Sequence, residues 1–473
     1  SSDVCSSDLR NGMKLYGLDI PVKNAPVLDT GYVPMAAFCR AFDKSAAGGK
    51  DIAVAVERNQ GQMAVRHFRI HGTPEMAEAD RVYVDRTVKM LLWAYGGYKV
   101  FICGDDGMAR VIKDAYQPGG SREFDADFMS RVYEKPFEVV ALPLDKTPAE
   151  KTLAQSVGRH LDGCRIGFDA GGSDRKVSAV VDGVPVYSEE VVWFPKTNAD
   201  PDYHFEGILS AFRTAASKMP RVDAIGVSSA GIYVDNRAMV ASLFLKVPRD
   251  LFDQKVKDIY IRAAKELGDI PLEVANDGDV TALAGAMSLE ENRVLGIAMG
   301  TSEAAGYVDT DGNITGWLNE LAFAPVDLQD DAMVDEWSGD KGCGVKYFSQ
   351  DSVIKLAPRA GIALDESLSP AEKLKVVQKE MEEGRESARD IYRSIGVYLG
   401  HALAYYAMYY SIAHVLLLGR VMSGEGGDLV IAEARRVLDE EYPEYAAMEL
   451  HLPDEKIRRV GQSVAAASLP QID

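Results

Sequence analysis

Apolar and polar positions predict regular structure from residue 163 onward. The segment CRIGFDAGGSDRKVSAVVDGVPVYSEEVVWF, residues 164–194, predicts three strands, separated by a glycine-rich turn and by a turn at Asp182-Gly183. Apolar residues at positions 208, 209, 212 and 215 predict a helix over residues 205–218, and VDAIGVSS then predicts a buried strand. Strands and helices continue to alternate toward the C-terminus, which indicates an α/β fold.

Residues 370–410 are predicted to be mostly helical. The first part, AEKLKVVQKEMEEGRESARDIY, is highly charged and is expected to face solvent. The second part, IGVYLGHALAYYAMYYSIA, is apolar and aromatic, which predicts a core helix leading into the short buried strand VLLLG. The apolar run from His401 to Leu418 is interrupted by polar residues, so we expect no membrane-spanning segment and no membrane partner.

Composition and charge narrow the function classes. The chain has 473 residues, of which 47% are hydrophobic and 26% charged, as in ordinary globular proteins. Its 52 Lys and Arg and 72 Asp and Glu give a net charge of −20, which argues against a nucleic-acid partner because phosphate backbones need a basic surface. A small anion such as ATP is not excluded, since it needs only a local cradle.

Cysteine and histidine usage argues against disulfides and metal clusters. The five cysteines are scattered without a C-x-x-C pair, which favours a reducing, cytoplasmic location. His67 and His71 lie four apart in a strand-like stretch, where that spacing is not diagnostic, and we expect no histidine pair with metal-ligand spacing. The polar residues 1–12 precede the first methionine, Met13, and are treated as a tail outside the fold.

The first candidate site is the segment Asp169-Ala-Gly-Gly-Ser-Asp-Arg-Lys176. A strand that ends in Asp169 runs into two glycines, which let a backbone approach a phosphate closely, and Ser173 and Lys176 add a hydroxyl and a charge. Asp169 is placed to hold Mg²⁺ through water, because hard cations prefer oxygen ligands. An ordinary hairpin with Gly-Gly at its turn explains the pattern equally well.

The second candidate site is Asn276-Asp277-Gly278-Asp279, between a predicted strand and the helical segment VTALAGAM. A carboxylate at this junction lies at the ligand-facing edge of an α/β sheet, where it can accept a proton from a hydroxyl. It can also simply cap the helix. Of the two aspartates, Asp279 is better placed to cap the helix, and we expect it to do so.

Two further turns follow buried strands. Gly300-Thr301-Ser302 forms a hydroxyl-rich turn between two apolar strands and can present donors to phosphates. The segment VLLLGRVMSGEGGD opens at Gly419 into a glycine-rich loop before a helix. Each signal is weak alone, because such loops are common.

In order, the four segments read DxGGSxxK, NDxD, GTS and LGxxxxG. This series resembles the sugar kinase, heat-shock ATPase and actin superfamily, and within it the ROK family of sugar kinases and sugar-responsive repressors. The resemblance covers about residues 163–473 and includes SSAGIYVDN at 228–236 and the small-residue segment GQSVAAAS. It implies an α/β, actin-like (ribonuclease H-like) two-lobe core, with lobe I at 163–275 and lobe II, including a C-terminal helix, at 276–473. An additional N-terminal α/β domain at 13–150 and a linker at 151–162 precede this core.

The resemblance also implies an ATP-dependent sugar kinase in which Asp277 is the general base. It implies that ATP and Mg²⁺ are needed, that the partner is a small-molecule sugar, and that the protein forms a homodimer. The implied sugar-binding residues are Asn276, Glu320, Ser229 and Gly231. The implied nucleotide-binding residues are Asp169, Gly171, Gly172, Ser173, Lys176, Gly300, Thr301, Ser302, Gly419 and Arg420.

The sequence departs from the family at its zinc motif. Ala322-Phe323 stands where the family has Gly-His, and Gly342-Cys343 alone represents the cysteine-rich motif. A structural zinc site needs four ligands of the Cys and His type, so we expect a zinc-free branch that folds and works without zinc. The altered sugar loop keeps an alternative open, a catalytically silent ROK-like sugar-binding or regulatory protein. Residues 13–150 show no basic recognition helix of a DNA-binding repressor.

Residues 51–106 repeat the predicted order strand, turn, strand, helix, strand of the lobe that begins at Arg165. This suggests a degenerate copy of that lobe, although an unrelated small α/β domain would show the same common order. The turn Arg58-Asn59-Gln60-Gly61 lacks the adjacent glycines of the phosphate turn, so we expect no nucleotide there. The expected role of such a copy is packing against the core or against a second subunit.

Overall fold

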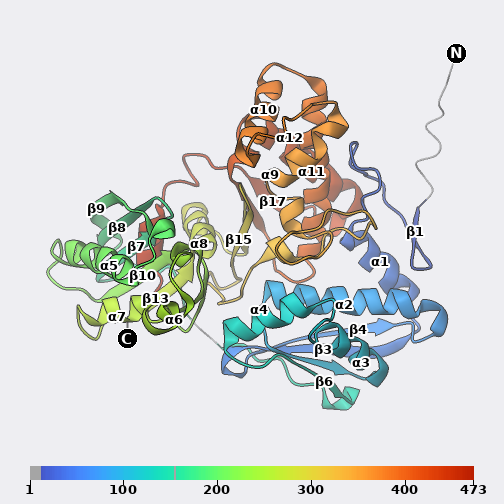
Figure 1. The fold of residues 1–473 in the computed structure, drawn as a ribbon, viewed down its shortest axis with the longest axis horizontal. Helices are drawn as coiled ribbons and strands as arrows, with labels where there is room; N and C mark the ends of the chain where they lie inside the picture. The colour runs from blue at the N-terminus through green and yellow to red at the C-terminus, as the bar shows by residue number, and fades with distance from the viewer. Residues whose placement is uncertain (1–11, 154–155, 473) are drawn as a thin grey trace.

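The computed structural model describes residues 12–153 and 156–472, so all but the last residue of the expected N-terminal tail lies outside the described residues. Three sheets of four or five strands dominate the chain (Figure 1). None of the described helices is both long and apolar enough to cross a membrane.

Lobe I is built on a five-stranded sheet in the order β13-β10-β7-β8-β9. Strands β7, β8 and β9 form an antiparallel meander, and β10 and β13 are parallel to β7. The central strands β7 and β10 are buried over almost their whole length because they are covered on both faces, whereas the edge strand β9 alternates in exposure. The strands are Cys164–Ala170 (β7), Asp174–Val181 (β8), Val184–Val192 (β9), Ala224–Ser229 (β10) and Leu272–Asn276 (β13), and the helices Pro201–Ala216 (α5), Arg249–Leu251 (α6) and Ile259–Lys265 (α7) belong to the same lobe.

Lobe II repeats this order on a four-stranded sheet, β15-β14-β16-β17. Strands β14 and β15 form an antiparallel hairpin, and β16 and β17 are parallel to β14. The shared order of hairpin and then parallel strands confirms the expected α/β, actin-like two-lobe arrangement. The strands are Val294–Met299 (β14), Glu303–Val308 (β15), His414–Leu418 (β16) and Glu449–His451 (β17), and the helices are Asp277–Leu289 (α8), Gln350–Leu356 (α9), Pro370–Glu382 (α10), Glu386–Tyr406 (α11) and Gly424–Glu441 (α12).

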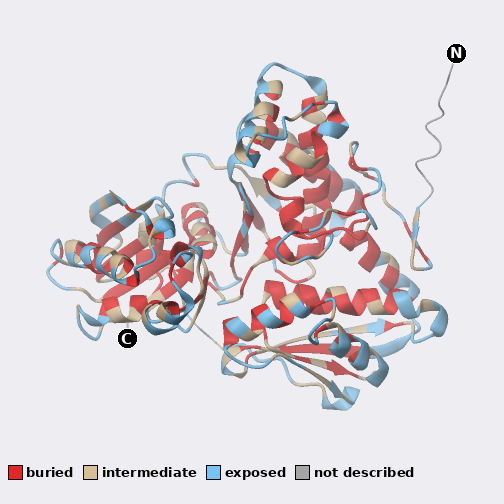
Figure 2. Ribbon diagram, in the orientation of Figure 1, coloured by how far each residue is buried: buried red, intermediate tan, exposed pale blue. Residues whose placement is uncertain are grey.

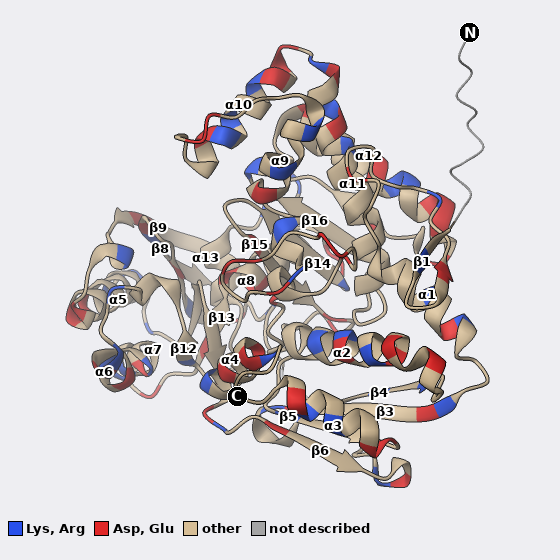
Figure 3. Cartoon of the chain, turned by 45° about the vertical axis from the view of Figure 1, so that its right-hand side comes forward, with Lys and Arg blue, Asp and Glu red and all other residues tan. Residues whose placement is uncertain are grey.

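The two halves of the predicted 370–410 helical region differ as the sequence predicts. Helix α10 carries charges of both signs on its outer surface (Figure 3), whereas α11 is buried over most of its length (Figure 2). The helix predicted over 205–218 is also confirmed as α5, and the strand predicted at VLLLG as β16.

The N-terminal domain has its own four-stranded sheet, β4-β3-β5-β6, below lobe II in Figure 1. Its buried apolar side chains join those of lobe II in one continuous cluster, whereas most of lobe I has a cluster of its own. The N-terminal domain and lobe II therefore share a core. Its elements are Met13–Leu15 (β1), Leu18–Ile20 (β2), Met35–Ser45 (α1), Lys50–Glu57 (β3), Met63–Ile70 (β4), Ala77–Ala94 (α2), Lys99–Cys103 (β5), Asp106–Ala115 (α3), Glu123–Tyr133 (α4) and Glu138–Leu142 (β6).

The N-terminal sheet is not a copy of lobe I, which corrects the duplication hypothesis. Strand β5 pairs antiparallel with β3, whereas the corresponding β10 is parallel to β7. The N-terminal sheet lacks the third strand of the lobe I meander. Each successive element reverses the direction of the chain, so without that strand every later element runs in the opposite direction. The order of elements in the sequence does not reveal this direction.

The C-terminal helix, Gln462–Ala467 (α13), packs between the sheet of lobe I and α8, whereas the sequence assigned it to lobe II alone. Two sheet glycines make this contact close. A Cβ at Gly167 would lie 1.7 Å from the Ser463 carbonyl oxygen, and a Cβ at Gly226 would lie 1.7 Å from that of Ala466. The chain therefore crosses from lobe I to lobe II and returns, and a boundary drawn along the sequence cannot represent this.

Substitution of Gly167 by Ala should therefore displace α13. We expect the free energy of unfolding to fall by about 1–3 kcal/mol, because the added methyl group overlaps a backbone carbonyl that cannot rotate away. Urea denaturation measures this loss. Gly48→Ala is the matched control, because a Cβ there meets nothing within 4 Å and its effect should stay within about 0.5 kcal/mol. Equal stability of the two variants would contradict the close packing.

Candidate functional site

Asp277 is the first residue of α8 and lies where β13 ends. Its Oδ1 accepts a hydrogen bond from the backbone N–H of Gly278 at 3.0 Å, and within the described residues Oδ2 accepts none. Burial raises the pKa of Asp277, and the positive charge of Lys196 partly offsets this. One carboxylate oxygen is thus left available for a ligand hydroxyl.

Asn276, and not Asp279, caps this helix. The Asn276 side-chain oxygen accepts from the Gly278 N–H at 2.8 Å, and its amide donates to the Gly231 carbonyl at 2.6 Å. Gly231 has a positive φ of 130°, and a Cβ there would lie 2.5 Å from the Val240 carbonyl oxygen. The structure thus brings together the predicted residues Asn276, Asp277 and Gly231.

Asp279 is a buried anchor, which corrects its predicted role as a cap. Its Oδ1 accepts from the Tyr307 backbone N–H at 3.0 Å and from the Asn319 amide at 2.8 Å. Burial raises its pKa to about 7. Asn276 takes the cap position because it precedes the first helical residue, whereas Asp279 lies inside the first turn.

Glu320 lies on a loop that the N-terminal domain holds in place. The backbone N–H of Asn319 donates to the Ala94 carbonyl at 3.0 Å, and that of Glu320 donates to the Trp93 carbonyl at 2.9 Å. These carbonyls belong to the last turn of α2, where a helix leaves its C=O groups without internal partners. Burial raises the pKa of Glu320 to about 7, and the charge of Asp277 contributes, so the two carboxylates are close.

Phe323 fills the place where the family pattern has its histidine. Its ring lies 4.3 Å from that of Trp93 between centroids, and it also packs near Phe124 and Trp337. The residues Ala322-Phe323 thus attach the loop that carries Glu320 to the N-terminal domain. Cys343, the remnant of the zinc motif, is buried, and burial raises its thiol pKa to about 12. Independence of zinc at this position stays a prediction.

Asp169 lies near the end of β7, beside Asp277. Its Oδ1 accepts from the Ser228 hydroxyl at 3.0 Å. Burial raises its pKa to about 6, and the nearby Asp277 charge contributes to the shift. A hard ion such as Mg²⁺ prefers oxygen ligands, and Asp169 stays the candidate residue for it.

The glycine turn after Asp169 lies under a lysine that sequence reasoning missed. The Lys196 ammonium is 3.0 Å from the position that a Cβ on Gly172 would occupy. It has no ion pair within the described residues, whereas Lys176 pairs with Glu190 at 3.6 Å. Lys196 follows Pro195 in a short 3-10 helix, and no spacing rule links it to the turn. Within the described residues, Lys196 is thus a cation without an ion pair at the predicted phosphate turn, which includes Ser173.

The two predicted turns of lobe II lie together. The Arg420 guanidinium donates to the Thr301 hydroxyl at 2.8 Å, and the Gly300 N–H donates to the Ser302 carbonyl at 3.0 Å. Gly419 has a φ of 95°, and a Cβ there would lie 2.3 Å from the Met299 carbonyl oxygen. Glycine is therefore required where β16 passes the GTS turn.

Ser229, in lobe I, and Glu303, in lobe II, are both buried. The Ser229 hydroxyl is bonded to the hydroxyls of Tyr260 at 2.8 Å and Tyr233 at 2.6 Å, so it positions the loop rather than facing a ligand. Glu303 follows the GTS turn, and both its carboxyl oxygens are buried without a hydrogen-bond partner in the described residues. Burial and the nearby Glu320 raise the Glu303 pKa well above its usual range. Sequence reasoning did not single out Glu303.

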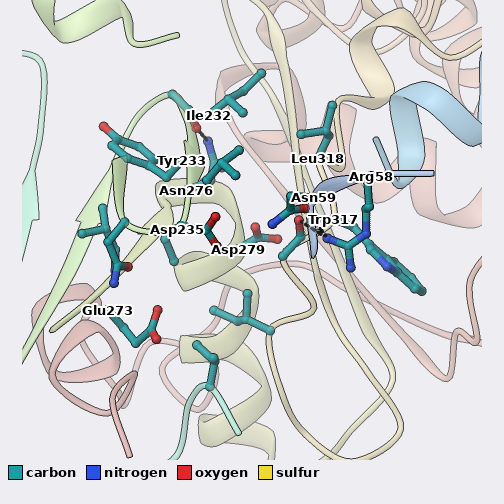
Figure 4. A pocket seen from close by; sticks show the side chains of 18 of the residues that line it. Arg58, Asn59, Ile232, Tyr233, Asp235, Glu273, Asn276, Asp279, Trp317 and Leu318 are labelled. Atoms are coloured by element: carbon teal, nitrogen blue, oxygen red, sulfur yellow. Dashed lines mark hydrogen bonds between the residues drawn. The ribbon is translucent and has the colours of Figure 1, made fainter. Parts of the chain in front are cut away.

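A cavity of about 280 Å³ opens beside Asn276, and all three parts of the chain line it (Figure 4). Lobe I contributes Gly231 and Glu273, lobe II contributes Trp317, and the N-terminal domain contributes Arg58. Asp277 and Glu320 do not line this cavity, although the Asp277 backbone adjoins it. Its mixture of carboxyl, amide, guanidinium and aromatic groups is typical of a small polar ligand site.

The turn between β3 and β4 bridges the two lobes beside this cavity. The Gln60 amide donates to Asp235 of lobe I at 2.7 Å, and the Arg58 guanidinium donates to the Gly316 carbonyl of lobe II at 3.4 Å. Figure 4 shows Arg58 and Asn59 opposite Asp235 and Glu273 across the cavity. The turn Arg58-Asn59-Gln60-Gly61, which lacks the adjacent glycines of the predicted phosphate turn, therefore forms one wall of this cavity.

Comparison with known proteins gives structural likeness only. No protein-family model matches the sequence, and no curated protein matches it. A ROK hexokinase from Thermus thermophilus is 18% identical with a TM-score of 0.48, and the alignment covers 64% of this chain and 97% of that one. A ROK family glucokinase from Streptomyces griseus, solved with glucose and AMPPNP, is 20% identical with a TM-score of 0.45, covering 65% and 98%.

A ROK family transcriptional regulator, a homologue of the E. coli MLC protein, is 17% identical with a TM-score of 0.48, and the alignment covers 65% of this chain and 79% of that one. Kinases and a regulator are thus found at the same level of likeness. The chain is similar in structure to ROK sugar kinases and regulators over about two thirds of its length, at low identity.

Proposed function

We propose that the protein is a kinase that transfers a phosphoryl group from ATP to a hydroxyl of a sugar or sugar derivative. The observation that carries the proposal is the position of Asp277. Its carboxylate has one oxygen without a hydrogen bond in the described residues. Its charge adds to the burial that raises the pKa of both Asp169, near the phosphate turn, and Glu320.

In this reaction the sugar hydroxyl oxygen forms a bond to the γ-phosphorus of ATP. The Asp277 carboxylate accepts the proton that this hydroxyl loses. The bond between that phosphorus and its bridging oxygen breaks, and ADP leaves. Asn276 and Glu320 orient the sugar, Lys196 and the Gly171–Ser173 turn hold phosphate oxygens, and Thr301 and Arg420 flank the nucleotide. Mg²⁺ held near Asp169 neutralises phosphate charge when bound.

The N-terminal domain completes the substrate site in this proposal. It supplies one wall of the cavity through Arg58 and Asn59, and it holds the Glu320 loop through α2. The alternative, a catalytically silent sugar-binding protein, would keep these contacts but not need Asp277. Phosphoryl transfer separates the two functions.

Asp277→Asn should abolish phosphoryl transfer while the protein still folds and binds ATP. The variant keeps the size and the hydrogen bond from Gly278 but cannot accept the proton, which removes at least the ~10²–10⁴-fold of a general base. Sugar-dependent ADP release measures the loss, and the thermal midpoint and nucleotide binding serve as controls. Full turnover in this variant would overturn the assignment of the base.

Lys196→Ala should weaken binding of ATP or its non-hydrolysable analogue about 10- to 100-fold, because a charge-assisted hydrogen bond contributes about 1.5–3 kcal/mol. Lys176→Ala is the matched control and should change binding by less than about threefold, since its ion pair with Glu190 is half exposed. Isothermal titration measures both. Equal losses in the two variants would mean that Lys196 has no special place at the turn.

The pH dependence of kcat/KM should have an acid limb near pH 6–7. Asp169 and Glu320 have pKa values raised to about 6 and about 7, so both gain protons as the pH falls through that range. Metal and proton binding require ionised carboxylates, and activity should therefore fall on the acid side with apparent values that belong to the cluster. A profile that stays flat down to pH 5 would contradict the account.

A further inference from the structure

The edge of the lobe II sheet carries two histidines and a glutamate on one face. Strands β16 and β17 are parallel, with His414 opposite Glu449 and Leu416 opposite His451. Residues two apart in a strand point to the same side, so Glu449 and His451 face the same way as their neighbour His414. The two histidines are 37 positions apart in the sequence, which is why spacing alone did not indicate them.

Three potential ligand atoms converge in this group. The His414 Nδ1 lies 3.1 Å from the His451 Nε2, and the Glu449 Oε2 lies 3.7 Å from the first and 3.8 Å from the second. A tetrahedral zinc ion with bonds of about 2.1 Å has ligand atoms about 3.4 Å apart. The observed triangle is therefore one face of such a tetrahedron with small adjustments.

We propose that His414, Glu449 and His451 form a binding site for a divalent cation of borderline softness, with Zn²⁺ as the representative ion. Imidazole and carboxylate are the ligands that such cations favour. The histidine side chains are 11% and 20% exposed and that of Glu449 is 67% exposed, so the fourth position faces solvent and takes water.

The surroundings of the group support a metal. The Glu291 Oε2 lies 3.7 Å from Nε2, the other ring nitrogen of His414, and Glu291 is 55% exposed. A carboxylate on the distal nitrogen is the usual partner of a metal-bound histidine, and a small rotation of this exposed side chain completes the hydrogen bond.

A simple hydrogen bond between the two rings accounts for less of the geometry. It explains the 3.1 Å distance, but it leaves the Glu449 carboxylate beyond hydrogen-bond reach of both ring nitrogens on which it converges. A shared cation explains all three distances. It would also fasten β17, which pairs through only three residues, to the strand that ends at Gly419.

This site is separate from the zinc motif expected in the family, of which Cys343 is the remnant. The sequence did not indicate it, because no two histidines have metal-ligand spacing there. His67 and His71 do not contribute, since His71 is engaged with Asp80 at 2.7 Å and with Ser45 at 2.9 Å. The fold does not depend on the ion, because both strands already pair through their backbones.

The test is titration of the chelator-treated full-length chain with Zn²⁺ by calorimetry, and with Co²⁺ by visible absorption. We expect one equivalent to bind with micromolar or tighter affinity, to raise the thermal midpoint and, for Co²⁺, to give the intense bands of a tetrahedral site. His451→Gln should weaken binding at least ~100-fold. His67→Gln is the matched control, because it removes a histidine distant from the group, and it should leave affinity unchanged.

Glu291→Gln guards against a folding defect in the ligand variant. This side chain is exposed, so the variant should fold normally, and loss of the outer carboxylate should weaken binding about 10-fold or more. Absence of saturable binding in the unaltered protein overturns the proposal. So does an affinity within about threefold of the unaltered protein in both His451→Gln and Glu291→Gln.

Discussion

The arrangement of the site depends on two backbone hydrogen bonds, from Asn319 and Glu320 to the free carbonyls at the end of α2. The carbonyls at a helix end need hydrogen-bond donors, and the backbone N–H groups of the loop that carries Glu320 supply them. Phe323 adds an aromatic contact with Trp93 just beyond. The N-terminal domain therefore holds the loop that carries the candidate sugar-binding carboxylate.

The same attachment decides which parts of the molecule can move. The N-terminal domain and lobe II share a continuous apolar core, to which Ile232 of lobe I also belongs, whereas most of lobe I has a cluster of its own. Polar contacts also join lobe I to the domain. These include the Gln60–Asp235 hydrogen bond and the pairs of Glu134 with Arg237 and Lys257. Exposed pairs of this kind contribute little to stability. In the proposed reaction, closure over the phosphoryl donor would be a rotation of lobe I against the other two parts.

The sequence predicted the local elements and much of the site because both follow from short patterns. Periodicity located α5, α10, α11 and β16, and glycine and hydroxyl motifs located the Asp169 and Thr301 turns. It could not predict the direction of β5, the return of α13 to lobe I, or the approach of Lys196 to Gly172, since these depend on how distant segments fold back. Asn276 caps the helix in place of Asp279, because the position relative to the first helical turn decides which residue caps.

The central claim is that Asp277 and its neighbours form a phosphoryl-transfer site rather than a silent binding site. The most direct measurement is ADP formation by the unaltered protein with ATP, Mg²⁺ and a panel of free sugars and sugar derivatives. The account predicts ADP release that depends on one class of sugar and is accompanied by an equal amount of phosphorylated sugar. Binding of a sugar and of ATP to the protein without any sugar-dependent ADP across the panel would contradict it.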